Sequence, residues 1–212
     1  MRSAAKTTVS VFGVIVSIAG FEHGVGAVLQ GNSAPGGVVF ESWPDAPAYE
    51  ILSGEPAMTV VPNLLVSGVL TVLVSVAFAV WSVRFVGIRR GGVGLIVLSV
   101  ILLLVGGGFG PPILGFVIGL AATRLESGWS WLEHNASETT RRRLGALWIP
   151  SLAVGVAGYV GLWPGVPLLA YSFGIAEAGL VIALTILGFV GLFSSLLTAF
   201  ARDSAHRSKH RS

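Results

Sequence analysis

Cysteine is absent from this chain of 212 residues. Disulfide frameworks, thiolate metal sites and dithiol redox chemistry are therefore excluded. Lysine is almost absent, since Lys6 and Lys209, near the two ends, are the only ones in the sequence. A Schiff-base chromophore deep in a helical bundle is therefore excluded as well. Charged residues of all kinds make up 11% of the chain, far below the average of about 25% in globular proteins.

Apolar residues make up 53% of the chain, and the mean hydropathy of the chain is +0.83. A membrane-spanning helix needs about 20 residues, so the chain has room for roughly five or six helices and no separate soluble domain. We expect a single integral membrane domain over residues 1–212, an all-α polytopic helical membrane protein. The basic residues lie at the ends of apolar runs, which indicates a lipid bilayer and not nucleic acid as the partner.

The apolar runs predict six helices, at about residues 8–30, 59–83, 87–106, 111–130, 144–163 and 170–201. Residues 31–57 form an acidic loop whose Pro and Gly residues argue against long regular structure, with one short strand at 38–40. Residues 164–167 are expected to turn the chain between the last two helices, and residues 202–212 to form a basic cytoplasmic tail.

The run from Gly91 to Thr123 decides the topology. If it crosses the membrane once, eight of the 13 Lys and Arg residues lie outside, whereas an outward and return crossing places all 13 on one side. The positive-inside rule favours the second arrangement. The sequence therefore predicts three outward-turning hairpins in a cell membrane, with cytoplasmic N- and C-termini. The stretch 106–112 is expected to be a turn, and its rival interpretation is a broken helix that lines a substrate site.

This run of 33 residues is shorter than the roughly 40 that two full crossings need. We expect the two helices to extend past Arg90 and Arg124, with the fourth helix short or tilted and with Trp129 and Trp131 as interfacial anchors. The alternative is five spanning helices plus a re-entrant hairpin.

The candidate site consists of the polar groups inside apolar runs. At 1.5 Å per residue, Glu22, Asn63 and Glu177 lie about 24, 31 and 37 Å from the basic residue at the inner end of their helices. All three are expected in the outer third of the membrane. The intramembrane polar site is therefore predicted to contain Glu22, His23, Asn63 and Glu177. The acidic loop above it carries Glu41, Asp45, Glu50 and Glu55.

Ionisable groups at that depth are costly and indicate function by default. We expect a small transporter or channel-like protein with an outward-facing Glu-His site for protons, cations or a cationic solute. The competing interpretation is that Glu22, His23 and Asn63 only form hydrogen bonds between helices. Adjacent helical residues point about 100° apart, which argues against a metal site shared by Glu22 and His23, and the other three histidines fall on the cytoplasmic side.

The alternative function is a non-catalytic membrane subunit or scaffold. Two pairs of glycines have the four-residue spacing that lets helices approach closely: Gly20 with Gly24, and Gly115 with Gly119. On this interpretation a membrane protein partner or a second copy of the chain packs against these glycines. The sequence contains no metalloprotease motif, nucleophile elbow or phosphate-binding loop. We therefore expect no catalytic residues and no cofactor.

Overall fold

The computed structural model describes residues 3–209, apart from the side chains of Glu133, Ser208 and Lys209. Four helical segments are long and apolar enough to span a membrane, and two apolar helices are shorter. The long ones are α1 (Ala4–Leu29), α2 (Leu64–Val80) continued by the π-turn η2 (Trp81–Phe85), α7 (Trp148–Val160) continued by η3 (Gly161–Gly165) and α8 (Val166–Phe173), and α9 (Ala178–Lys209). The shorter ones are α3 (Gly91–Leu104) and α4 (Gly110–Ala122). Large apolar side chains remain exposed along these helices, as lipid contact requires. Membrane-compatible helices were predicted, and they are present.

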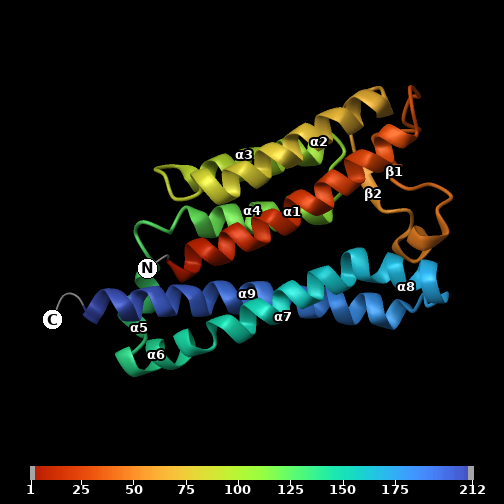
Figure 1. Cartoon of the computed structure of the whole chain (residues 1–212). Helices are drawn as coiled ribbons and strands as arrows, with labels where there is room; N and C mark the ends of the chain where they lie inside the picture. The colour runs from red at the N-terminus through yellow and green to blue at the C-terminus, as the bar shows by residue number, and fades with distance from the viewer. Residues whose placement is uncertain (1–2, 210–212) are drawn as a thin grey trace.

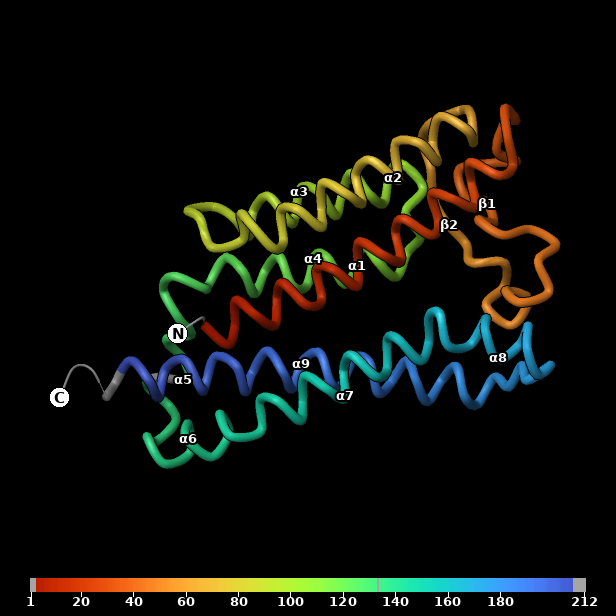
Figure 2. The backbone as a smooth tube through the Cα atoms, viewed as in Figure 1, coloured from red at the N-terminus to blue at the C-terminus, as the bar shows by residue number. Residues whose placement is uncertain are grey.

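Helix α1 is the centre of the bundle (Figure 1), because it packs against α2, α4, α7 and α9. Helices α2, α3 and α4 lie on one side of it, and α7 and α9 lie on the other (Figure 2). The core is drawn from four of these helices, with Phe12 of α1, Phe78 of α2, Ile118 of α4 and Leu192 of α9 fully buried.

Helices α7 and α9 approach each other through glycine. A Cβ atom on Gly191 would lie 2.2 Å from the backbone nitrogen of Gly155, and one on Gly158 would lie 2.4 Å from the backbone nitrogen of Gly188. Backbones can come this close only where side chains are absent, which is how small residues stabilise helix pairs in membranes.

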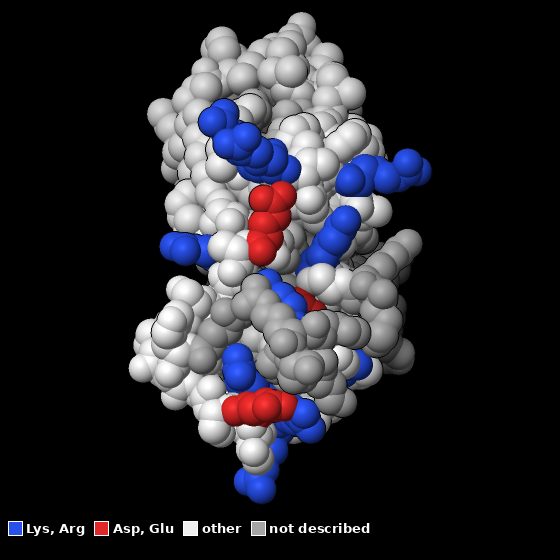
Figure 3. All heavy atoms as spheres, turned by 90° about the vertical axis from the view of Figure 1, so that its left-hand side faces the viewer, with Lys and Arg blue, Asp and Glu red and all other residues white. Residues whose placement is uncertain are grey.

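The two ends of the bundle differ in charge. The Lys and Arg residues that the structure describes lie at the start of α1, between α2 and α3, between α4 and α7, and in the last turns of α9, and they gather on the end shown in Figure 3. Asp203 of α9 closes this end, because its carboxylate accepts hydrogen bonds from the backbone nitrogens of Ala4 (2.8 Å) and Ala5 (3.0 Å) at the N-terminus of α1. An acidic group at a helix N-terminus is favourable.

The opposite end carries the loop between α1 and α2. It contains β1 (Val39–Glu41), the 3₁₀ helix η1 (Pro47–Leu52) and β2 (Pro56–Met58). The two strands pair antiparallel, with Phe40 opposite Ala57. Strand β1 confirms the single strand expected at 38–40 within one residue, whereas β2 was not predicted. Helix η1 packs against α8, so this loop bridges the two sides of the bundle.

The turn predicted at 164–167 is wrong. The chain kinks at Trp163, whose φ and ψ are −144° and 123°, and then continues as α8. Pro167 is tolerated there because it stands in the first turn of α8, where a helix leaves its amide groups unpaired. The turn comes after Phe173, where Gly174 adopts the left-handed conformation (φ 66°) that ends a helix. The last helix consequently begins at Ala178 and not at 170.

The predicted extension of the third and fourth helices past their arginines is also wrong. Helix α3 begins after Arg90, which is left-handed (φ 67°) and ends the preceding connection. Helix α4 ends at Ala122, and Trp129 packs edge-on against Phe200 of α9 in place of extending α4. Two short helices, α5 (Ser130–Asn135) and α6 (Glu138–Ala146), follow at the basic end. The expectation of a short fourth helix agrees with the 13 residues of α4.

Candidate functional site

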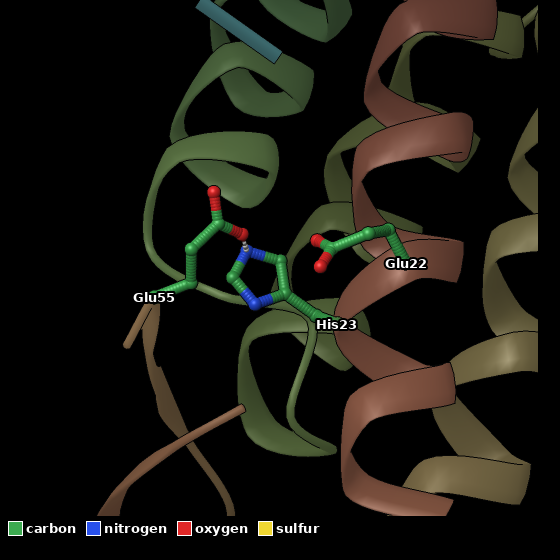
Figure 4. Close-up of side chains that lie close together, drawn as sticks. All are labelled: Glu22, His23 and Glu55. Atoms are coloured by element: carbon green, nitrogen blue, oxygen red, sulfur yellow. Dashed lines mark ion pairs between the residues drawn. The ribbon is translucent and has the colours of Figure 1, made fainter. Parts of the chain in front are cut away.

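Helix α1 supplies two adjacent ionisable residues to the interior of the bundle. Glu22 and His23 are each only 6% exposed, although both belong to the last third of a helix that is otherwise apolar. Glycine surrounds them, with Gly20 against Ser75 of α2 and Gly24 against the backbone of Gly68. The close approach of α1 and α2 therefore leaves the Glu22 and His23 side chains on the side that faces the loop and α4 (Figure 4).

The loop is attached to α1 one to two turns beyond His23, at Gly26 and Gln30. The side-chain amide of Gln30 donates hydrogen bonds to the carbonyl oxygens of Glu41 and Ser42, both at 3.0 Å. Gly26 makes this possible, since a Cβ atom there would lie 2.3 Å from the Ser42 carbonyl oxygen. The attachment brings the buried Ser42 hydroxyl to 2.8 Å from Nδ1 of His23, which fixes the orientation of the imidazole ring.

Glu55 reaches the site from a strained turn. Ser53, Gly54 and Glu55 have successive positive φ angles of 54°, 65° and 52°, and such a conformation costs about 1–3 kcal/mol for a residue other than glycine. The backbone nitrogen of Ser42 donates to the Glu55 carbonyl at 3.1 Å, so the turn is held by the paired strands. As a result the Glu55 side chain points inward, with Oε2 3.2 Å from Nε2 of His23.

The protonation of the loop groups reflects their burial. The Glu55 side chain is 14% exposed, and burial raises the pKa of its carboxyl group above the usual 4.5. Burial first, and the neighbouring Glu22 carboxyl group second, raise the pKa of Tyr49 to about 12. The Tyr49 ring stacks on Trp43, with 5.0 Å between the centroids. The phenol therefore stays neutral near the carboxyl groups and helps to cover them.

The Glu22 carboxyl group completes the cluster. Ligand atoms of Glu22, His23 and Glu55 all lie within 4.8 Å of one another, and Figure 4 shows the three side chains pointing toward a common centre. Neither oxygen of Glu22 meets the geometry of a hydrogen bond with a described residue, although both are buried, and the Glu55 carboxyl and Tyr49 hydroxyl groups are its interacting neighbours. Buried polar groups normally have well-formed hydrogen bonds, so the Glu22 carboxyl group stands out within the cluster.

The turn between α3 and α4 closes the site from the other side. A Cβ atom on Gly108, whose φ is 75°, would lie 2.2 Å from Nε2 of His23, so only glycine fits there. The turn is held by Ser67 and Thr71 of α2, whose hydroxyl groups both donate to the Val105 carbonyl oxygen at 2.6 Å. Residues 106–109 are thus a turn, as predicted for this stretch, and Gly110, Pro111 and Pro112 already form the first turn of α4.

A cavity of about 310 Å³ adjoins the cluster. It lies between the α1–α4 side and the α7–α9 side of the bundle, and Glu55 and Leu52 of the loop line one part of it. Its ionisable groups are His23, Glu55 and the Tyr159 phenol, and the rest of its wall is mostly apolar, including Leu114 and Phe189. The cluster therefore opens onto a space large enough for a small ligand.

The other residues predicted for the site lie elsewhere. Asn63 is the N-cap of α2: its side chain accepts a hydrogen bond from the backbone nitrogen of Val66 at 3.0 Å and donates one to Asn32. Glu177 is exposed in the connection between α8 and α9, because α9 begins one residue later than this position. Three of the loop carboxylates are exposed on the surface at the same end: Glu41, Asp45 and Glu50.

Sequence reasoning missed two partners of His23, namely Ser42 and Gly108, and did not separate Glu55 from the other loop carboxylates. It also predicted that the Glu22 and His23 side chains point to different faces of the helix and do not share one ligand site. The 100° between adjacent residues is correct for the Cα–Cβ bonds, but the long Glu22 side chain bends back toward the imidazole (Figure 4). The turn-forming pair Ser53-Gly54 before Glu55 was the one local signal that this carboxylate differs from its neighbours.

No protein-family model matches this chain, and no curated protein or solved structure matches it either.

Proposed function

We propose that this protein is a small transporter or channel-like membrane protein that binds a cation from the outer side at Glu22, His23 and Glu55. The observation that carries the proposal is the Glu22 carboxyl group, which is 6% exposed and makes no well-formed hydrogen bond with a residue that the structure describes, although it interacts with Glu55 and Tyr49. Leaving such a group in a membrane costs several kcal/mol. A purely structural carboxyl group is expected to form well-aligned hydrogen bonds, whereas a cation-binding role needs oxygens that can turn toward an ion.

The proposed topology has six crossings in three outward-turning hairpins. It is supported by the charge asymmetry, because the described Lys and Arg residues lie at one end and the positive-inside rule makes that end cytoplasmic. The opposite end, with the loop and the Glu22 cluster, is then the outer side. Both termini belong to the cytoplasmic side in this arrangement.

The contacts of α3 support a full crossing of the membrane rather than a re-entrant hairpin. At one end, the Trp81 indole nitrogen at the basic end of α2 donates to the Gly91 carbonyl at 2.9 Å. At the other end, Thr59 of the loop pairs with Val105, and the Val60 nitrogen donates to the Leu104 carbonyl at 2.9 Å. Helix α3 therefore extends from the basic end to the loop, although its 14 residues measure only about 21 Å.

Flux measurements in proteoliposomes test the function. Purified protein is reconstituted with a pH-sensitive dye or a zinc-sensitive dye inside the vesicles, and a proton or Zn²⁺ gradient is imposed. We expect a flux above that of protein-free vesicles, reduced to the background rate by Glu22→Gln or Glu55→Gln. The matched control is Glu177→Gln, an exposed carboxylate at the same end, which should keep the wild-type rate. Equal fluxes in all variants, or none in the wild type, would contradict the proposal.

The alternative is a scaffold that binds a partner through glycine-rich helices. Its predicted contact residues are used within the chain: Gly20 and Gly24 contact Ser75 and Gly68 of α2. In the same way, Gly115 lies against Ser99 of α3. These glycines therefore give no support to a partner surface, and the cation site has the stronger structural basis.

A further inference from the structure

We propose that Glu22, His23 and Glu55 bind a single divalent transition-metal ion of the Zn²⁺ type, an inference that rests on the cation-binding function proposed above. Two carboxylates and one imidazole are ligands that Zn²⁺, Mn²⁺ and Fe²⁺ accept. Three such side chains converge here from a helix and a loop, with ligand atoms within 4.8 Å of one another.

The spacing of His23 and Glu55 already suits two ligands of one ion. Zinc bonds of about 2.0–2.1 Å in a tetrahedral site place neighbouring ligand atoms about 3.3 Å apart. The distance between Nε2 of His23 and Oε2 of Glu55 is 3.2 Å. One oxygen of Glu22 lies within 4.8 Å of a ligand atom of each of these two residues, and no well-formed hydrogen bond to a described residue holds its carboxyl group in place.

Ser42 has the role that a neighbour of a metal-binding histidine usually plays. Metal-bound imidazoles almost always use their second nitrogen in a hydrogen bond that fixes the ring and its tautomer. The Ser42 hydroxyl lies 2.8 Å from Nδ1 of His23 and is fully buried. When Nδ1 donates to Ser42, Nε2 turns a lone pair toward Oε2 of Glu55, 3.2 Å away, and either a proton or a metal ion between the two atoms satisfies both.

Charge balance favours a divalent ion over a monovalent one. Two carboxylates and a neutral imidazole sum to −2, which a divalent ion cancels, and charge cancellation matters most where the surroundings are apolar. The described Lys and Arg residues cannot provide this compensation, because they lie at the other end of the bundle. The adjoining cavity of about 310 Å³ leaves room for an exogenous ligand at the open position that three protein ligands leave on the ion.

The test is isothermal titration of the full-length, tag-free, chelator-treated protein in detergent with Zn²⁺. His134, His206 and His210 are first changed to Gln, so that binding by these histidines does not contribute. We expect one Zn²⁺ per chain. Ser42→Ala should weaken binding about 10- to 100-fold, and Ser42→Thr, which keeps the hydroxyl group, should restore most of it. Glu22→Gln and Glu55→Gln should weaken binding further, whereas the exposed Glu50→Gln should leave it unchanged.

Three results would overturn the inference. One is Zn²⁺ binding that Glu22→Gln leaves unchanged while the variant keeps the wild-type melting temperature. Another is the absence of Zn²⁺ binding to the wild type. The third is Glu22-dependent binding of a lipophilic organic cation, tetraphenylphosphonium, that Zn²⁺ does not displace, because this would assign the carboxylates and the cavity to an organic ligand.

The same data separate this inference from the proposed function. Proton flux that depends on Glu22 without Zn²⁺ binding would refute the metal site and leave the transporter. Zn²⁺ binding that depends on Glu22 without any flux would refute transport and leave the metal site.

Discussion

Replacing Gly191 by alanine should push helices α7 and α9 apart. A Cβ atom on Gly191 would lie 2.2 Å from the backbone nitrogen and 2.3 Å from the Cα atom of Gly155. Ordinary contact begins at 3.4 Å, so the two backbones must separate by about 1.2 Å to admit one methyl group. Both obstructing atoms are backbone atoms, and no side-chain rotation can relieve the clash.

The expected loss of stability follows from two opposing contributions. Forcing an extra methyl group into a packed interface costs about 1–3 kcal/mol, while alanine gains about 0.5–1 kcal/mol over glycine inside a helix. The net change for Gly191→Ala is a loss of about 1 kcal/mol, within a range of about 0–2.5 kcal/mol. The matched control is Gly179→Ala in the same helix, where nothing lies within 4 Å of the added methyl group. Its stability should be unchanged or slightly higher.

The assay is thermal unfolding of the purified protein in detergent, followed by the fluorescence of its six tryptophans. We expect Gly191→Ala to unfold at a lower temperature than the wild type, and Gly179→Ala to unfold at the same or a higher temperature. If Gly191→Ala were as stable as Gly179→Ala, the close packing of α7 on α9 would be wrong.

Three further predictions concern the site and the basic end. Gly108→Ala should abolish Zn²⁺ binding because its methyl group would lie 2.2 Å from the His23 ring; Gly110→Ala, with open space around it, should bind normally in the same titration. Asp203→Asn should lower the stability by about 1 kcal/mol, measured by thermal unfolding, because it weakens the cap of α1. Burial raises the pKa of Glu55 above 4.5, so the folded protein holds this proton more tightly than the unfolded chain. The contribution of Glu55 to the free energy of unfolding is therefore complete below pH 4.5 and is lost as the pH rises through the pKa of the folded protein. Thermal unfolding at several pH values, with a chelator present, should show a smaller loss of stability with rising pH for Glu55→Gln than for the wild type.

The helices could be predicted from sequence because their signals are local. Apolar runs of sufficient length mark α1 and α2 directly and most of α9, and the glycines of 106–108 with Pro111 and Pro112 mark the end of α3 and the start of α4. The charge asymmetry is equally local, since it depends only on where Lys and Arg stand relative to these runs. None of these inferences needs to know which helices touch.

Other features depend on contacts that sequence spacing does not reveal. The kink at Trp163 and the turn at Gly174 both involve residues that commonly form turns, and a single sequence does not say which one reverses the chain. The site itself is non-local: Ser42 and Glu55 reach His23 only because Gln30 and Gly26 hold the loop against α1. Depth along a helix placed Glu22 and His23 correctly near the loop, but it could not distinguish them from Asn63 or Glu177.

Single-cysteine labelling in intact cells is the measurement that tests the outward orientation of the site most directly. The sequence contains no cysteine, so Phe109→Cys at the turn beside the site and Ser137→Cys at the basic end each introduce a single thiol. Both positions are exposed. With a thiol reagent that cannot cross the membrane, we expect labelling at 109 and protection at 137. Labelling at 137 with protection at 109 would place the Glu22 cluster on the cytoplasmic side and would contradict an outward-facing cation site.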